Sequence, residues 1–216
     1  MFLSRIFTLY PEYFPGYLSK GLFGRAMGKI WNLETVNIRD YALDKHKTVD
    51  DTPYGGGNGM IIKPDVLAKS IDENIKQDEK IIYLSPRGKI FNYKYAKKLS
   101  NEKTLNLVCG HFEGVDERVL ESRNIEEISI GDFILSGGEV AAFVILESVL
   151  RFIPGVLGNI KSSHEDSFEN GLLEYPQFTK PQIWEKKKVP NVLISGDHTK
   201  IKDWRLSQSE AITRDR

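Results

Sequence analysis

The sequence predicts an α/β fold, with a mostly parallel sheet and helices on both of its faces. Apolar, β-branched runs alternate along the chain with segments whose apolar residues recur at helical spacing, and this alternation is typical of such sheets. The chain has 216 residues, 40% hydrophobic and 28% charged, which is enough for a full core and one small extra domain. No apolar run approaches the ~20 residues of a transmembrane helix.

The first part of the chain predicts two strands and a helix. Strands are expected over residues 2–9 (FLSRIFTL) and 34–43 (ETVNIRDYAL). A helix is expected over residues 64–75, because its apolar residues have helical spacing and Pro64 suits a first turn. The N-terminus has no basic start and no A-x-A-like cleavage site, so it is interpreted as a core strand rather than a signal peptide.

From residue 80 the alternation is regular. Strands are expected over residues 80–84, 104–110 and 126–131, and helices over residues 92–100, 115–123 and 137–153. The last of these helices is long and almost wholly apolar, so we expect it to be largely buried.

Pro154 and Gly155 end that helix and introduce a polar stretch without periodicity. We therefore divide the chain into a domain over residues 1–159, a flexible linker over residues 160–172 and a small helical domain over residues 173–216. A final helix is expected over residues 197–214, with Asp197 or Thr199 as its N-cap.

The charge and cysteine content limit the kinds of partner and of stabilising site that the chain can have. The formal net charge is zero, but residues 176–216 hold nine Lys or Arg against five Asp or Glu. This basic excess is either a solvated surface or a contact for a polyanion. Cys109 is the single cysteine, so no intrachain disulfide can form, and without a Cys–His cluster a structural zinc site is not expected. These features favour a cytoplasmic protein.

Three of the expected strands run into loops rich in Gly, Pro and polar residues. The loops are SPRG (85–88), CGHFEG (109–114) and GDFILSGGE (131–139). Ligands of open α/β sheets bind beyond the carboxyl ends of the strands, so the loops predict one shared site. The chain has neither a P-loop nor a G-x-G-x-x-G after its first strand. A ligand held by main-chain groups without phosphates, such as S-adenosylmethionine, fits better.

Longer motifs resemble those of the bacterial tRNA (guanine-N(1))-methyltransferase family, TrmD. They are KHKTVDDTPYGGGNGM, YLSPRG, CGHFEGVDERV, SIGDFILSGGE, RFIPGVLG and EDSFENGLLEYPQFTKP. The resemblance covers nearly the whole chain. It implies the SPOUT fold, whose α/β domain carries a trefoil knot in its C-terminal part, and methyl transfer from S-adenosylmethionine to N1 of guanosine 37 in tRNA.

The resemblance also implies residue roles. The donor contacts would be Leu84, Ser85, Pro86, Gly110, Glu113, Ile130, Gly131, Asp132, Phe133, Ile134, Leu135, Gly137 and Gly138. Plain core packing is the alternative for the apolar members of this set. A role for Mg²⁺ near Glu113 stays open, and no metal ligands are assigned.

Two further residues would carry the chemistry. N1 of guanine must lose a proton before it attacks the methyl group. The resemblance implies Asp166, in the linker, as the general base and Arg151 as the group that stabilises the anionic purine. The alternatives are a helix N-cap for Asp166 and a complement to the helix dipole for Arg151.

The family pattern further implies a homodimer whose sites combine the knot of one chain with the linker of the other. The RNA contacts would include His46, Asp50, Tyr54 and Gly56. The small helical domain would add Lys180, Lys200, Lys202 and Arg205. For the Lys186–Lys188 run, a solvated surface turn is the alternative. His111, Asn58 and Glu174 depart from the family pattern. Another SPOUT RNA methyltransferase, or an RNA-binding dimer without activity, is the alternative.

Overall fold

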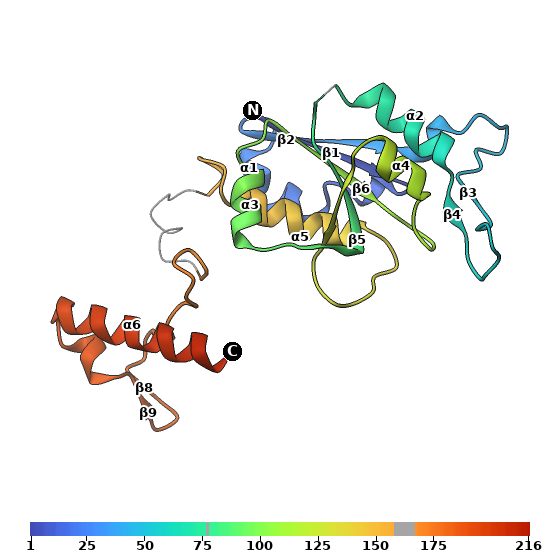
Figure 1. The fold of residues 1–216 in the computed structure, drawn as a ribbon. Helices are drawn as coiled ribbons and strands as arrows, with labels where there is room; N and C mark the ends of the chain where they lie inside the picture. Colours follow the sequence, from blue (N-terminus) through green and yellow to red (C-terminus); the bar gives the residue numbers. More distant parts are fainter. Residues whose placement is uncertain (77, 158–166) are drawn as a thin grey trace. The chain divides into compact units, whose positions relative to one another are not determined.

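The computed structural model describes residues 1–76, 78–157 and 167–216. These residues fall into two units, Met1–Gly158 and Asn159–Arg216. The first unit is built on a five-stranded sheet with the order β2–β1–β6–β5–β7, in which every neighbouring pair is parallel (Figure 1). The strands are β1 Phe2–Thr8, β2 Trp31–Asn37, β5 Ile81–Ile90, β6 Thr104–Cys109 and β7 Glu126–Ser129. The expected mixed α/β fold with a mainly parallel sheet is confirmed.

Helices cover both faces of this sheet (Figure 1). On one face α1 (Gly21–Ala26), α3 (Tyr93–Leu99) and α5 (Glu139–Leu150) contribute to one buried cluster. On the other face α2 (Pro64–Asn74) and α4 (Glu117–Ser122) contribute to a second. Successive residues of a strand point to opposite faces, so Ile6 lies in the first cluster and Phe7 in the second. This explains why the strands read as continuous apolar runs.

Side-chain caps explain where several helices begin. The carboxamide of Asn92 accepts a hydrogen bond from the Tyr95 amide at 3.0 Å, at the start of α3. Asp116 begins α4 through the same kind of contact. Such caps satisfy amide groups that have no partner within the helix.

The strand expected over residues 34–43 was partly wrong. The strand β2 begins earlier, at Trp31, and ends at Asn37. The Asn37 side chain accepts a hydrogen bond from the Arg39 amide at 3.1 Å, and the chain turns there into a 3-10 helix, Ile38–Tyr41. This local side-chain contact competes with the strand ladder.

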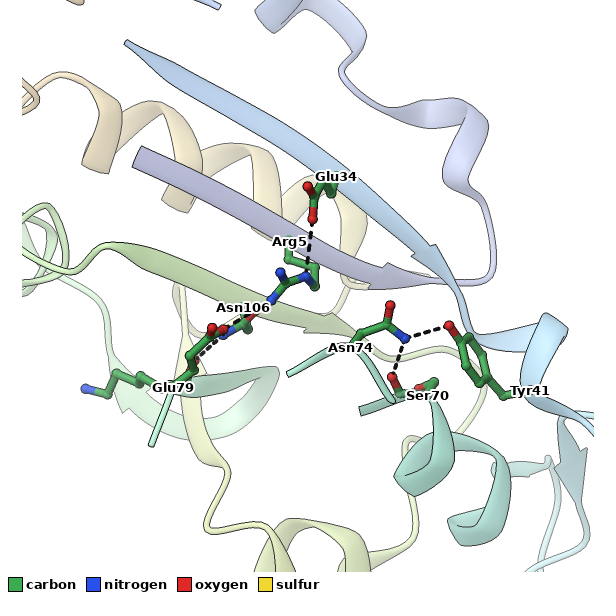
Figure 2. A network of polar contacts seen from close by, with 8 residues as sticks. Arg5, Glu34, Tyr41, Ser70, Asn74, Glu79 and Asn106 are labelled. Carbon is green, nitrogen blue, oxygen red and sulfur yellow. Dashed lines mark hydrogen bonds and ion pairs between the residues drawn. The ribbon is translucent and has the colours of Figure 1, made fainter. Parts of the chain in front are cut away.

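A polar network crosses the middle of the sheet (Figure 2). The Arg5 guanidinium, on β1, donates to the buried Asn106 on β6 at 2.9 Å and to Glu79, just before β5, at 3.1 Å. Arg5 also lies 3.4 Å from Glu34 on β2. Asn106 donates in turn to Glu79 at 3.1 Å. Because its members satisfy one another, the network stabilises the strand order without leaving a buried charge unpaired.

The second unit contains a short hairpin and a long helix. The strands β8 (Ile183–Trp184) and β9 (Lys187–Lys188) pair antiparallel, and a 3-10 helix, Asn191–Ile194, follows them. The helix α6 runs over His198–Asp215, and Asp197 caps it by accepting from the Lys200 amide at 3.1 Å. Within the described residues, no helix has both the length and the apolar content needed to span a membrane.

Candidate functional site

The loops that follow β5, β6 and β7 surround one cavity of about 250 Å³ at the carboxyl ends of these strands. Twelve of the thirteen predicted donor contacts line it: Leu84, Ser85, Pro86, Gly110, Glu113, Ile130, Gly131, Phe133, Ile134, Leu135, Gly137 and Gly138. The thirteenth, Asp132, is exposed and does not belong to the lining. The structure therefore brings together three sequence segments that lie up to 54 positions apart.

The loop from β5 is made by a break in strand pairing. Leu84 and Lys89 both pair with Ile128 on β7, so the four residues between them bulge out of the ladder. Gly88 allows this, because a Cβ there would collide with the backbone of Ile128. Arg87 holds the bulge in place by ion pairs with Glu117 at 2.8 Å and Glu127 at 3.1 Å. Ser85 and Pro86 are thereby placed on the cavity wall.

The loop from β6 packs directly against the start of α5. The Gly138 amide donates to the Gly110 carbonyl at 3.0 Å. A Cβ on Gly138 would lie 2.7 Å from the Cα of Cys109, so a larger residue would need the backbone to move. Glycine at this position lets main-chain groups form the wall of the cavity.

Tyr83 belongs to the cavity lining, and the hydroxyl end of its ring lies beside Gly110 and Gly114. Burial, reinforced by the nearby Glu127 carboxylate, raises the pKa of the Tyr83 phenol to about 12. The group is therefore neutral at physiological pH. The cavity lining thus includes a neutral phenol among apolar side chains and main-chain groups.

The loop from β7 supplies most of the apolar wall. Gly131 has φ +149°, in the region that favours glycine, and its carbonyl accepts from the Phe133 amide at 3.0 Å. The next side chains are unusually exposed for their type: Phe133 is 53% exposed and Ile134 is 81% exposed. This loop therefore offers apolar surface to a ligand or to another chain.

A buried carboxylate lies where the β6 loop meets α5. His111 Nε2 lies 2.9 and 2.8 Å from the two carboxylate oxygens of Glu139. The Thr8 hydroxyl donates to the same carboxylate at 2.6 Å, and Glu139 is only 4% exposed. Glu139 also stands in the first turn of its helix, where the helix dipole favours a negative charge. These contacts join the β6 loop and α5 to β1.

Cys109 is buried beside this carboxylate. Burial, and then the charge of Glu139, raise the pKa of the thiol well above its usual range. A thiol held neutral in this way is a poor nucleophile. Cys109 therefore has a packing role.

Three of the four predicted RNA-contact residues of the first unit lie on one segment beside the cavity. The short strands β3 (Asp50–Asp51) and β4 (Ile61–Ile62) pair antiparallel, and the glycine-rich loop between them carries a Tyr54 that is 99% exposed. The end of this loop joins the cavity wall, because the Glu113 amide donates to the Met60 carbonyl at 2.9 Å. The structure thus places Asp50, Tyr54 and Gly56 on a segment attached to the β6 loop; His46 precedes it in an exposed turn.

Of the two predicted catalytic residues, the structure describes Arg151, which does not line the cavity. Arg151 is exposed and stands at the C-cap of α5. The twelve residues of this helix span about 18 Å, and the cavity lies at the helix's other end. Asp166 lies outside the described residues.

In the second unit Lys180 is exposed, and Arg205 is partly buried. The Arg205 guanidinium lies 4.7 Å from the centroid of the Tyr175 ring. Phe178 contacts Trp204 nearby, with their ring centroids 6.2 Å apart. Arg205 thus helps to hold the segment before the hairpin against α6.

Sequence reasoning did not assign Glu139 or Tyr83 to the site. A signal for Glu139 was present, because it is a lone carboxylate at the start of an apolar helix. No such signal marked Tyr83, because it lies inside an apolar stretch that predicts a buried core strand. Among the described side chains, no group of three His, Cys, Asp or Glu residues is arranged to hold a metal ion.

Comparisons with known proteins agree with the motifs. A family model described as tRNA (Guanine-1)-methyltransferase TrmD matches residues 2–216. A Pelagibacter ubique protein named tRNA (guanine-N(1)-)-methyltransferase is 69% identical, over 99% of this chain and 94% of its own length. Proteins with the same name from Bartonella tribocorum and Jannaschia sp. are 56% and 48% identical, over 100% and 99% of this chain and 93% and 89% of their own lengths.

Proposed function

The chain belongs to the tRNA (guanine-1)-methyltransferase family TrmD, and we propose that it transfers a methyl group from S-adenosylmethionine to N1 of guanosine 37 in tRNA. One observation carries this proposal: three loops of a family member converge on a cavity lined by main-chain and apolar groups. Membership of the family supports the methyl-transfer reaction. The cavity is the site that we propose for the methyl donor. A tRNA substrate makes the cytoplasm its expected location.

The cavity suits S-adenosylmethionine in its chemistry. Its described lining residues include no Lys or Arg, so they are not suited to a phosphate group. The apolar side chains of the β7 loop suit the flat face of adenine, and the main-chain groups around Gly110 and Gly138 suit its hydrogen-bonding edge. The Glu113 carboxylate, which belongs to the lining, would help to neutralise the positive charge of the donor's sulfonium. When bound, the donor supplies an electrophilic methyl group on a sulfonium.

The remaining chemistry belongs to protein side chains. Asp166 would accept the proton that guanine carries on N1, which creates the nucleophile. The negative charge then spreads onto O6, and Arg151 would stabilise it. A carboxylate and a guanidinium on either side of the base would also fix its orientation.

The distance along α5 supports a site made by two chains. Arg151 stands about 18 Å from the end of the helix that borders the cavity, which is beyond the reach of its side chain. A second copy could bring its own Arg151 and Asp166 to this cavity, and symmetry would create two equal sites. The exposed Phe133 and Ile134 beside the cavity would be covered in such a homodimer.

The domain roles follow from this arrangement. Residues 1–159 would form the knotted donor domain, residues 160–172 the linker that carries the base, and residues 173–216 the tRNA-binding domain. The trefoil knot would include the three loops of the cavity, which would explain their tight mutual packing.

A methyl-transfer assay tests the proposal. Labelled S-adenosylmethionine is incubated with the protein and with two transcripts of one tRNA, which carry guanosine or adenosine at position 37. We expect label only in the guanosine transcript. Equal labelling of both transcripts, or label in neither, would overturn the proposal.

A further inference from the structure

The hairpin of the second unit has an unusual combination of side chains. It pairs β8 with β9 and is closed by a hydrogen bond from the Val189 amide to the Gln182 carbonyl at 3.0 Å. The two turn residues, Glu185 and Lys186, have φ values of 46° and 66°. A two-residue turn with both φ values positive matches the right-handed twist of paired strands.

Strand register places aromatic and cationic groups on the same face. Trp184 pairs with Lys187, and Ile183 pairs with Lys188. Residues directly opposite in an antiparallel pair point to one face, with their Cβ atoms about 5 Å apart. The side chains of Trp184 and Lys187 therefore leave the hairpin on the same face.

Both faces of the hairpin are exposed within the described part of the second unit. Trp184 is 61% exposed and Ile183 is 56% exposed. Lys186, Lys187 and Lys188 are also exposed, and within the described residues none of them forms an ion pair. The hairpin thus combines an exposed aromatic ring with three cations and one acidic residue, Glu185. This combination favours a flat, negatively charged partner.

We propose that the β8–β9 hairpin is an RNA-binding element that contacts the tRNA substrate through Trp184 and Lys187. Trp184 stacks on an unpaired base or a ribose, and Lys187 contacts a neighbouring phosphate. Aromatic rings stack on any base, while lysines supply sequence-independent affinity for the backbone. The inference rests on the proposed function for the identity of the RNA. It assigns a purpose to a lysine run that is otherwise a solvated turn.

Binding of tRNA to full-length variants tests the inference. Trp184→Ala should weaken binding about tenfold, and Trp184→Phe, which keeps a ring, should recover most of the loss. Lys187→Ala should weaken binding and lower the slope of log affinity against log salt by about 1; Lys187→Arg should preserve both. Leu22→Ala and Lys97→Ala, exposed positions of the first unit, serve as matched controls. Binding of S-adenosylmethionine should be equal in all variants.

Three outcomes separate this inference from the proposed function. Wild-type affinity and salt slope in both alanine variants would overturn the hairpin inference, even if guanosine 37 is methylated. Loss of tRNA binding in the variants of a protein that methylates no guanosine would support the inference and overturn the function. If Trp184→Ala instead changes the oligomeric state in sedimentation, the hairpin is an interface between copies and the inference is wrong.

Discussion

His111 and Glu139 form a close buried pair at the junction of the β6 loop and α5. The imidazole nitrogen Nε2 lies within 2.9 Å of both carboxylate oxygens. The pair joins segments that are 28 residues apart, and both segments border the cavity. The contact gives a structural role to His111, which departs from the family pattern, because its Nε2–H can donate to this carboxylate.

A double-mutant cycle measures this pair. His111→Phe keeps the ring contact with Tyr10, whose centroid lies 4.9 Å away, but leaves the buried Glu139 carboxylate without its nitrogen partner. We expect a loss of about 3 kcal/mol in the free energy of unfolding. Adding Glu139→Gln removes the unpaired charge, so the double variant should be more stable than additivity predicts, by about 2 kcal/mol. Urea denaturation provides the four values.

Exposed Glu121→Gln on α4 is the control and should be nearly neutral. Strict additivity of the two substitutions would show that His111 and Glu139 do not stabilise each other.

Gly138 should tolerate no side chain. Its φ is −78°, which any residue adopts, so strain is steric: a Cβ would lie 2.7 Å from the Cα of Cys109. We expect Gly138→Ala to cost about 1–3 kcal/mol of stability and to weaken S-adenosylmethionine binding at least tenfold, measured by calorimetry. Val140→Ala, at an exposed position two residues later, should change neither. If Gly138→Ala bound S-adenosylmethionine as tightly as the wild type, the contact between Gly138 and the β6 loop would not be part of the donor site.

Tyr83 predicts a loss of stability at high pH. Its pKa is about 12 in the folded protein, against about 10 in an unfolded chain. Below pH 10 the phenol is neutral in both the folded and the unfolded state, so ionisation of Tyr83 does not lower the free energy of unfolding there. Between pH 10 and 12 only the unfolded state ionises, which lowers stability by up to about 1.4 kcal/mol per pH unit. Tyr83→Phe should reduce that slope in urea titrations, and an identical slope would contradict the neutral buried phenol.

Complementation between two inactive variants tests the shared site. Asp166→Ala should bind donor but not turn over, and Leu135→Asp, in the apolar wall, should lose donor binding while keeping the base. If each site combines two chains, mixed dimers contain one intact site, and an equal mixture should recover about one quarter of wild-type activity. Recovery requires subunit exchange, which co-expression ensures. If the co-expressed mixture were as inactive as either variant alone, the general base and the donor pocket of each site would belong to the same chain.

The sheet and its helices were predictable because each strand carries its own signal. A strand buried on both faces is rich in apolar residues. Residues 2–8 and 104–109 are so, apart from polar members such as Arg5 and Asn106, and Asn92, Asp116 and Asp197 mark helix starts locally. Convergence of the three loops also followed from the sequence, since parallel strands end at one edge of a sheet.

Contacts between distant residues left no such signal. The pairing of His111 with Glu139 depends on how the β6 loop crosses the start of α5. The bulge between Leu84 and Lys89 depends on their shared partner Ile128. Such features are set by tertiary packing rather than by periodicity.

The most direct test of the central claim identifies the methylated atom. A tRNA transcript with guanosine at position 37 is incubated with the protein and S-adenosylmethionine, digested to nucleosides and analysed by mass spectrometry against methylguanosine standards. The account predicts 1-methylguanosine as the product, in wild-type protein and not in Asp166→Ala. Methylation of guanosine at N2, N7 or the ribose would contradict it.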